Sequence, residues 1–481
     1  MSIEIKKCAV LGAGVMGAQI AGHIANAGIP SLLFDMNEEL AQKGVDGLSK
    51  LKPAPLFSSS NASLVTPCTY DNDMEKLNDC DLIIEAVAEK IEIKHAVYKN
   101  LLPHLKQGAI LASNTSGIPL ANLVEVLPED VQKSFLIAHF FNPPRYLKLL
   151  ELVKGEKTSD EVYETMTEFG ETTLGKGIVH AKDTPGFIGN RLINAGGPLT
   201  YHKAVEMGLT IEDVDALSGT LVGNAKSAYF RTQDVVGLDT ALNVQNNMFD
   251  RVTTESDEER QKFKAPDMLV KLVEDGRLGQ KSGSGWYKKE GKEILSLDLD
   301  TMEYTPTKKR MFDTIRVGKP IKDLKKRLAA ITYLDDIGAK FLWECNAPMF
   351  TYTAELIPEI ADSIVEIDNA MRWGFAREVG IFDAWDAIGV EKSVNKMKEE
   401  NRKVPAWVEQ MLAAGRKSFY EIKNGEMTYW CPVDKKPVVY KQNKKVLNLN
   451  LYKNTKNTIK RDWSASIHDI GDGVLNVEFH S

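Results

Sequence analysis

Residues 8–17 have the sequence Cys8-Ala9-Val10-Leu11-Gly12-Ala13-Gly14-Val15-Met16-Gly17, and this stretch decides the fold. The apolar segment predicts a strand, the glycines a tight turn, and the small residues up to Gly28 a helix that ends at a glycine. Gly12 permits the turn, Gly14 lets the backbone approach a pyrophosphate, and Gly17 lets the helix pack against the strand. The unpaired N–H groups at the helix N-terminus face the phosphates. The pattern therefore predicts a dinucleotide-binding turn in preference to a plain βαβ connection.

An acidic residue ends the next predicted strand, Ser31-Leu32-Leu33-Phe34-Asp35. Asp35 lies eighteen residues beyond Gly17, where an acidic side chain binds the 2′-hydroxyl of the adenosine ribose. Met36 and Asn37 follow it, so no adjacent cation is available for a 2′-phosphate, and the Asp35 charge repels one. The sequence therefore favours NAD over NADP as the cofactor.

The composition is that of an ordinary globular protein, since 43% of the 481 residues are hydrophobic and 26% are charged. A net charge of −7 gives no indication of a nucleic-acid-binding surface. The five cysteines lack CxxC spacing, which predicts reduced thiols and neither a disulfide framework nor a bound metal. The N-terminus enters the first strand directly and no apolar run is long enough to cross a bilayer, so we expect a cytoplasmic protein without a signal peptide.

Predicted strands alternate with helices through the first part of the chain, with strands at residues 81–87, 108–112 and 135–139. This alternation predicts an α/β fold with a doubly wound sheet, whose ligand lies beyond the carboxyl ends of the strands. Ser116 lies just beyond one strand, and His139 ends the next. Glu151 lies among leucines twelve residues later, where a buried carboxylate needs a partner such as an imidazole. The alternative is a solvent-facing Glu151 beside a core His139, and we favour the pair.

The remainder of the chain is predicted to be mainly helical. Residues 183–186 close the first domain, and Asn190, on the first turn of the next helix, either faces the cleft or caps the helix. Residues 211–216 and 230–237 resemble residues 364–370 and 381–389, which predicts two copies of one helical unit. A basic, solvated connector is expected at 435–461, and a hairpin with an Asp-Gly turn at 465–480.

Taken together, the motifs resemble those of the L-3-hydroxyacyl-CoA dehydrogenases of fatty-acid β-oxidation. The resemblance covers residues 5–290 directly and extends to about residue 425 if the second helical copy is included. The motifs that carry it are the glycine-rich loop at 12–17, Ser113-Asn114-Thr115-Ser116, His139-Phe140-Phe141-Asn142-Pro143-Pro144, residues 183–191, and Lys281-Ser282-Gly283 before Gly285-Trp286-Tyr287. The tail from Ala465 resembles the first strands of an enoyl-CoA hydratase (crotonase) domain. The chain thus resembles the dehydrogenase half of a bifunctional protein, truncated where the hydratase begins.

The resemblance implies a Rossmann-type doubly wound sheet followed by two all-α domains like the C-terminal domain of 6-phosphogluconate dehydrogenase. The implied domains are an NAD-binding Rossmann domain (1–183), a first helical domain (184–290), a linker (291–330), a second helical copy (331–425), a linker (426–461) and the start of a crotonase-like domain (462–481). The second copy is expected to pack on the first as a partner subunit does in the dimeric enzymes. We therefore expect a monomer, or a dimer formed through another surface.

The resemblance also implies oxidation of (S)-3-hydroxyacyl-CoA to 3-oxoacyl-CoA with NAD. His139 is then the general base, Glu151 orients its ring, and Ser116 and Asn190 hydrogen-bond the substrate oxygen. The residues expected near the cofactor are Gly12, Ala13, Gly14, Val15, Met16, Gly17, Asp35, Glu89, Lys94, Asn142 and Lys281. The expected partners are an acyl-CoA thioester and an enoyl-CoA hydratase, fused or separate, with no nucleic acid and no membrane.

Two other functions are compatible with the same scaffold. Another β-hydroxyacid or sugar-acid dehydrogenase would commonly use a lysine where this chain has a histidine with an acid. A catalytically silent cofactor-binding or scaffold protein would have no need of all four residues Ser116, His139, Glu151 and Asn190. The 3-hydroxyacyl-CoA dehydrogenase is therefore the favoured function.

Overall fold

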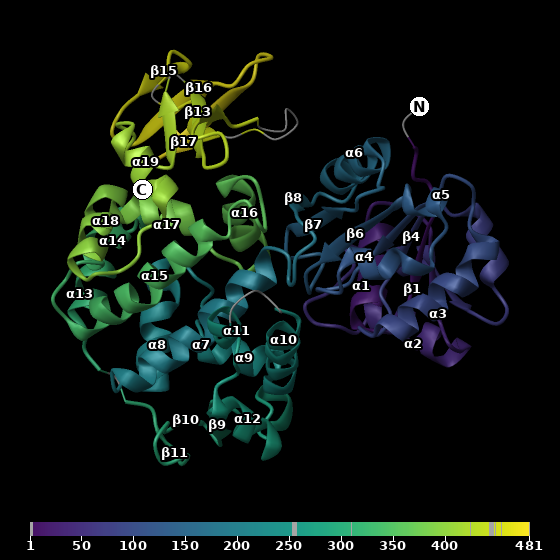
Figure 1. The fold of residues 1–481 in the computed structure, drawn as a ribbon, viewed down its shortest axis with the longest axis horizontal. Coiled ribbons are helices and arrows are strands. Elements are labelled where there is room, and N and C mark those ends of the chain that lie inside the picture. Colours follow the sequence, from purple (N-terminus) through teal and green to yellow (C-terminus); the bar gives the residue numbers. More distant parts are fainter. Residues whose placement is uncertain are drawn as a thin grey trace.

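An eight-stranded sheet forms the first part of the chain and lies at the right of Figure 1. The computed structural model describes residues 3–252, 257–308, 310–423, 425–441, 447, 449–453 and 455–480. The strands of this sheet are β1 (Cys8–Leu11), β2 (Ser31–Asp35), β3 (Val65–Thr69), β4 (Leu82–Glu85), β5 (Ile110–Ser113), β6 (Phe135–Phe140), β7 (Leu149–Lys154) and β8 (Gly177–Ala181).

The strand order explains where a ligand would bind. Six parallel strands have the order β3-β2-β1-β4-β5-β6, which is the order of the Rossmann fold, so the expected doubly wound sheet is confirmed. β7 is antiparallel to β6, and β8 is parallel to β7. After β1 the chain continues to β2 and β3 on one side of the sheet, and after β4 it continues to β5 and β6 on the other side. The direction of the strand order therefore reverses between β1 and β4. Ligands of such sheets bind in the crevice beyond the carboxyl ends at this point.

Helices connect the strands of this sheet. The central strands have largely apolar sequences, as burial between helices requires. β1, β4, β5 and β6 are buried along their full length, as expected for strands covered on both faces. The connecting helices are α1 (Val15–Asn26), α2 (Glu38–Leu48), α3 (Ile91–Leu101), α4 (Leu120–Leu123), α5 (Glu129–Gln132) and α6 (Asp160–Glu168). Asn37 caps α2 by accepting the N–H of Leu40 at 2.9 Å, which ends the extended segment after Asp35.

A first group of helices follows the sheet. It contains α7 (Gly189–Glu206), α8 (Ile211–Ser218), α9 (Phe230–Val236), α10 (Leu238–Arg251), α11 (Asp257–Gln261) and α12 (Asp267–Glu274). A three-stranded antiparallel sheet closes this group at the bottom of Figure 1, with strands β9 (Tyr287–Glu290), β10 (Glu293–Leu297) and β11 (Tyr304–Pro306).

A second group of helices packs on the first, chiefly through contacts between α15 and α7. It contains α13 (Asp313–Gly318), α14 (Leu324–Ile331), α15 (Ile337–Glu355), α16 (Ile364–Gly374), α17 (Ile381–Ile388), α18 (Val390–Glu399) and α19 (Ala406–Ala413). The sheet that follows has strands β12 (Tyr420–Lys423), β13 (Glu426–Cys431) and β14 (Lys436–Val439). Part of the predicted linker at 426–461 is therefore sheet, because β13 buries Trp430 and Cys431 against the helices and β14 pairs with it.

Each of the two helical groups contains an equivalent hydrogen-bond network around one carboxylate. Asp215 of α8 accepts N–H groups at the start of α9 and the Tyr287 hydroxyl at 2.8 Å. Asp368 of α16 likewise accepts N–H groups at the start of α17 and the Tyr420 hydroxyl at 3.0 Å. The repeated network agrees with the internal repeat that the sequence predicts.

A second pair of carboxylates occupies equivalent positions in the two helical groups. Asp234 accepts the N–H groups of Trp286 and Tyr287, and Asp386 accepts those of Phe419 and Tyr420. Burial raises the pKa of Asp234 to about 6 and that of Asp386 to about 7, although the hydrogen bonds from the backbone act in the opposite direction. Both carboxyl groups therefore take up protons more readily in the folded chain than in the unfolded chain.

We expect stability to fall as the pH rises from 5 to 8, and Asp386→Asn to flatten this dependence. The Asp386 carboxyl has a pKa of about 4 in the unfolded chain and about 7 in the folded chain. Its proton-linked stabilisation is thus complete below about pH 4 and is lost as the pH rises through 7, a change of about 4 kcal/mol in all, of which roughly 2–3 kcal/mol falls between pH 5 and 8. Calorimetry at pH 5, 6, 7 and 8 measures it, with Asp46→Asn on an exposed helix position as control. Equal slopes for wild type and Asp386→Asn would contradict the assignment.

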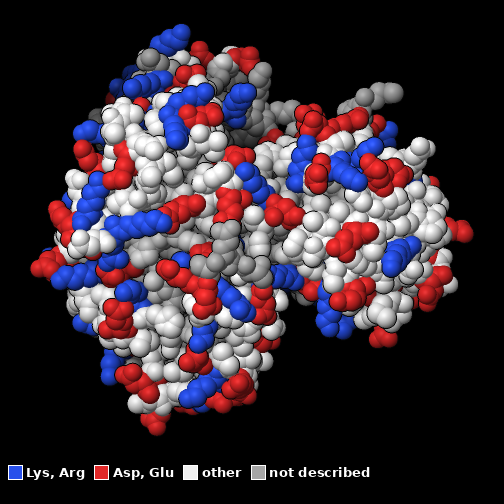
Figure 2. Space-filling model, viewed as in Figure 1, with Lys and Arg blue, Asp and Glu red and all other residues white. Residues whose placement is uncertain are grey.

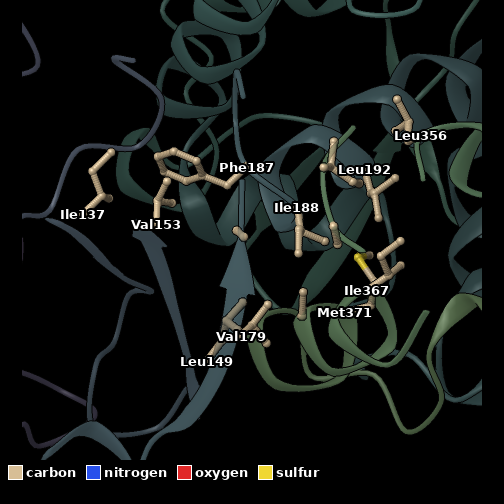
Figure 3. Close-up of a cluster of buried hydrophobic side chains, with 14 of the residues drawn as sticks. Ile137, Leu149, Val153, Val179, Phe187, Ile188, Leu192, Leu356, Ile367 and Met371 are labelled. Atoms are coloured by element: carbon tan, nitrogen blue, oxygen red, sulfur yellow. The ribbon is translucent and has the colours of Figure 1, made fainter. Parts of the chain in front are cut away.

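A continuous apolar core joins the sheet to the helices (Figure 3). Phe187, just before α7, lies beside Val153 and Ile137 of the sheet. Ile188 lies between the strand residue Val179 and Met371 of α16. The start of α7 is therefore packed between the sheet and the second helical group, which positions it where β6 ends and β7 begins.

The last described strands are β15 (Thr458–Arg461), β16 (Ala465–Asp469) and β17 (Leu475–Phe479). β16 and β17 form the predicted antiparallel hairpin, and the turn between them contains Asp472 and Gly473, both with positive φ. Acidic and basic side chains are intermingled over the face drawn in Figure 2. Within the described residues, no helix combines the length and the apolar character needed to cross a membrane.

Candidate active site

The glycine-rich loop connects β1 to α1 at the switch point of the sheet. Asp35, at the end of β2, accepts the N–H of Ala13 at 2.7 Å and that of Met36 at 2.7 Å. Its carboxylate therefore lies beside the loop and ties the two strand ends together. Asp35 remains partly exposed, so the same carboxylate is accessible to a ligand hydroxyl.

The space around the three loop glycines fits a dinucleotide. Gly12 has a φ of +105°, and a Cβ there would lie 2.7 Å from the carbonyl oxygen of Ala86. A Cβ on Gly17 would lie 1.8 Å from the carbonyl oxygen of Gly12. A Cβ on Gly14 would meet nothing within 4 Å, so open space lies in front of the loop at this residue. Gly14 is the residue that precedes α1, and it has no side chain to cap the helix. The first N–H groups of α1 are therefore available to an anion such as pyrophosphate.

A buried carboxylate network lies beyond β4. Glu85 is fully buried and accepts hydrogen bonds from Lys94 at 2.7 Å, Tyr98 at 3.0 Å and Ser113 at 2.6 Å. Lys94 also lies 3.3 Å from Glu89. Lys94 is itself 1% exposed, so its charge is enclosed between Glu85 and Glu89.

Glu89 joins this network to the loop after β5. It accepts the Thr115 hydroxyl at 2.7 Å and the Ser116 N–H at 3.0 Å, and Arg251 of α10 lies 3.4 Å away. Burial alone would raise the pKa of Glu89, but the Lys94 charge and the hydrogen bonds outweigh it and bring that pKa below its usual value. Glu89 therefore holds the Ser116 loop in place as an anion.

His139 and Glu151 face each other across neighbouring strands. They are paired in the register of β6 and β7, and His139 Nδ1 lies 2.8 Å from Glu151 Oε2. His139 is 4% exposed and Glu151 is 0% exposed. The alternative with a solvent-facing Glu151 is therefore wrong, because the carboxylate is buried and paired with the imidazole. Nε2 of His139 has no hydrogen-bond partner within the described part of the chain.

The other oxygen of Glu151 holds the start of α7. Oε1 accepts the N–H of Gly189 at 2.8 Å and that of Ile188 at 3.2 Å. Positive partial charge at a helix N-terminus stabilises a carboxylate. One carboxylate thus aligns the His139 ring and fixes the first turn of α7, which carries Asn190.

Aromatic rings surround the His139 imidazole. Phe141 lies with its centroid 4.5 Å from the imidazole and Phe187 with its centroid 5.6 Å away. Phe375, from the loop after α16, lies 5.6 Å from Phe141 in an edge-on arrangement. The second helical group therefore contributes a wall to the site, although the sequence assigns the active residues to the first part of the chain.

Ser116 and Asn190 have side chains with no hydrogen-bond partner among the described residues. The Ser116 loop packs on residues 183–186, since a Cβ on Gly117 would lie 3.2 Å from the N–H nitrogen of Gly186. Asn142, three residues after His139, accepts a hydrogen bond from Gln19 of α1 at 3.1 Å. These contacts place the Ser116 loop beside the segment that precedes α7, and Asn142 beside α1.

Lys281 lies apart from this group. It forms an ion pair with Asp239 at the first turn of α10, whereas Arg251 at the opposite end of α10 contacts Glu89. α10 has 14 residues, so its ends are roughly 20 Å apart. The structure therefore does not bring Lys281 to the glycine-rich loop.

Three further residues of this region, Glu85, Arg251 and Phe375, are not among those predicted from the sequence. An acid at the end of the apolar strand Leu82-Ile83-Ile84-Glu85 is a signal that could have identified Glu85. Arg251 and Phe375 come from distant helical segments without a local motif, so only the tertiary packing identifies them.

Comparisons with known proteins agree with this geometry. Residues 7–184 match the family model described as the 3-hydroxyacyl-CoA dehydrogenase NAD binding domain, and residues 186–289 match the 3-hydroxyacyl-CoA dehydrogenase C-terminal domain. A probable 3-hydroxyacyl-CoA dehydrogenase of Bacillus subtilis is 40% identical over 100% of this chain, which spans 63% of that relative.

Two shorter proteins are also similar. A probable 3-hydroxyacyl-CoA dehydrogenase of Deinococcus radiodurans is 42% identical over 60% of this chain and 84% of its own length. The solved 3-hydroxybutyryl-CoA dehydrogenase of Escherichia coli has the same fold, with a TM-score of 0.64 over 86% of this chain and 99% of that chain, at 23% identity. The chain therefore belongs to the 3-hydroxyacyl-CoA dehydrogenase family.

Proposed function

We propose that this chain oxidises (S)-3-hydroxyacyl-CoA to 3-oxoacyl-CoA with NAD, in fatty-acid β-oxidation or related short-chain acyl-CoA metabolism. The observation that carries the proposal is the buried His139–Glu151 pair, in which the 2.8 Å contact uses Nδ1 and leaves Nε2 free. A histidine oriented by a carboxylate, at a sheet edge that also carries a dinucleotide loop, is an arrangement for removing a hydroxyl proton.

His139 accepts the proton that leaves the substrate hydroxyl. Because Nδ1–H donates to Glu151, Nε2 carries the lone pair that takes the proton of the substrate 3-hydroxyl. Glu151 then stabilises the imidazolium, since it is a buried carboxylate next to the new charge. In the reductive direction, His139 returns this proton to the substrate oxygen.

The free side chains of Ser116 and Asn190 hydrogen-bond the substrate oxygen and hold C3 in place. Phe141 and Phe187 pack around the imidazole and keep bulk water from it. The loop at 12–17 and Asp35 would hold the cofactor, with Asn142 at the nicotinamide side, Glu89 near the cofactor ribose and Lys94 behind Glu89. NAD, when bound, accepts the hydride that leaves C3.

Stereospecific turnover tests the proposal. NAD reduction is followed at 340 nm with (S)-3-hydroxybutyryl-CoA, with the (R) enantiomer as control. We expect turnover of the (S) substrate alone. Equal turnover of both enantiomers, or reduction of NAD by a free β-hydroxyacid but by neither thioester, would favour another β-hydroxyacid dehydrogenase.

Asp35 is expected to determine the preference for NAD. Replacing Asp35 with serine removes a charge that repels a 2′-phosphate, and replacing the exposed Met36 with arginine adds a group that binds one. The double variant should shift the ratio of kcat/KM toward NADP by roughly 10²-fold. Parallel assays with NADH and NADPH measure this shift, and Met36→Arg alone is the control. An unchanged preference would show that Asp35 does not lie at the ribose.

A further inference from the structure

A cavity of about 460 Å³ lies between the two helical groups. Its walls come from α7, α9 and α10 of the first group and from α15, α16 and α17 of the second. Asn190, the residue proposed to bind the substrate oxygen, is one of its lining residues. The cavity is therefore continuous with the proposed active site at the first turn of α7.

Arg377 is the only charged residue among those that line this cavity, all of which belong to the described part of the chain. Across that part of the chain, no hydrogen bond, ion pair or ring contact engages its guanidinium. Arg377 is partly exposed to this cavity, and its partial burial lowers the pKa of its guanidinium to about 10 without an acidic neighbour that opposes the effect. A partly buried cation without a counterion in an otherwise uncharged cavity favours a ligand that supplies negative charge.

The loop that carries Arg377 is anchored at both ends. Phe375 contacts Phe141 and also packs closely on Gly189 at the start of α7, where a Cβ would lie 3.0 Å from the Phe375 ring. On the other side of Arg377, the N–H of Glu378 donates to the carbonyl of Gly223 at 2.8 Å. The loop therefore runs from the aromatic wall of the active site toward the segment after α8, with Arg377 two residues beyond Phe375.

The chemistry of the walls indicates which part of the substrate enters. Coenzyme A carries several phosphates, and a cavity with a single cation and many apolar residues such as Ile193, Val244 and Leu342 does not suit it. The acyl chain beyond C3 suits these walls. A single arginine matches one carboxylate, which it binds through two parallel hydrogen bonds.

We propose that Arg377 binds a carboxylate at the far end of the acyl chain, so that the preferred substrates are 3-hydroxyacyl-CoA thioesters with a terminal carboxylate. The proposal rests on the proposed function. A methyl-terminated chain of the same length leaves the guanidinium unpaired, and polar groups left unpaired in a buried site discriminate strongly against such a substrate.

The test compares two pairs of substrates that differ only in the last group of the acyl chain. They are 3-oxoadipyl-CoA against 3-oxohexanoyl-CoA, and 3-oxosuberyl-CoA against 3-oxooctanoyl-CoA, each assayed with NADH. The variants are Arg377→Met, which keeps the apolar stem, and Arg377→Lys, which keeps the charge. Arg316→Met, at an exposed position of α13, is the matched control. Melting temperatures are measured for every variant.

In at least one pair, wild type should prefer the carboxylate-terminated substrate by tenfold or more in kcat/KM. Arg377→Met should lower kcat/KM for that substrate by roughly 10²-fold and leave the methyl-terminated one within about twofold, without a fall in melting temperature. Arg377→Lys should restore part of the preference. A wild-type preference for the methyl-terminated substrate in both pairs would overturn the inference.

Equal losses on both members of a pair in Arg377→Met would also overturn it, because the arginine would then serve a group common to all substrates, such as a coenzyme A phosphate. A fall in melting temperature shared by Arg377→Met and Arg377→Lys, with no change in preference, would identify a structural residue and overturn it as well. Turnover of the methyl-terminated substrates in these cases would leave the proposed function standing. Absence of turnover with all four would overturn the proposed function itself.

Discussion

Replacing His139 with glutamine is expected to lower kcat by roughly 10²–10⁴-fold while NADH still binds. Glutamine has neither the basicity to take the 3-hydroxyl proton nor a second nitrogen to pair with Glu151. The dinucleotide loop belongs to β1 and α1, at a distance along the sheet from β6, so its geometry should be unaffected. Steady-state kinetics with acetoacetyl-CoA give kcat, and the fluorescence of bound NADH gives the dissociation constant.

The control for His139→Gln is His202→Gln, on an exposed position of α7. This control should retain wild-type kcat. Full activity of His139→Gln would remove the histidine as general base, and loss of NADH binding would indicate instead that the substitution distorts the sheet edge.

Replacing Glu151 with glutamine is expected to lower kcat by roughly 10²–10⁴-fold with little change in stability. The glutamine carbonyl can still accept the N–H groups of Ile188 and Gly189, so α7 keeps its anchor. Its amide then donates toward Nδ1 of His139, which forces the proton onto Nε2 and removes the lone pair that accepts the substrate proton. The loss therefore comes from the wrong tautomer of the imidazole.

Glu151→Ala separates the two roles of this carboxylate. It removes the histidine partner and also leaves the two N–H groups at the start of α7 without an acceptor, at a cost of about 1–3 kcal/mol. Both variants should lose activity, but only Glu151→Ala should lower the melting temperature by several degrees. A Glu151→Gln variant that is fully active would show that the orientation of the His139 ring does not depend on a carboxylate.

Local patterns predicted the first part of the molecule well, because each signal lies within a few residues. The glycine loop, its helix and Asp35 form one continuous stretch, and the sheet order follows from the alternation of strands and helices. The His139–Glu151 pair was predictable because a carboxylate among leucines needs a partner and the two residues lie on successive strands. The hairpin at the C-terminal end was predictable from its Asp-Gly turn.

The remaining features depend on contacts between distant segments. The bonds from Ile188 and Gly189 to Glu151 use backbone N–H groups, which have no signature in the sequence. Phe375 and Arg377 reach the site from the second helical copy, whose active-site role the internal repeat does not indicate. Strands β13 and β14 lie in a stretch rich in lysine, and the alternation of Met427, Tyr429 and Cys431 was too short to predict a sheet there.

The most direct test of the account follows the absorbance of NADH while the wild-type protein and the His139→Gln variant each meet acetoacetyl-CoA, with NADPH in a parallel reaction. We expect rapid oxidation of NADH by wild type, little oxidation of NADPH, and nearly complete loss of the reaction in His139→Gln. Wild-type protein that binds NADH but leaves it unoxidised in the presence of acetoacetyl-CoA would contradict the account.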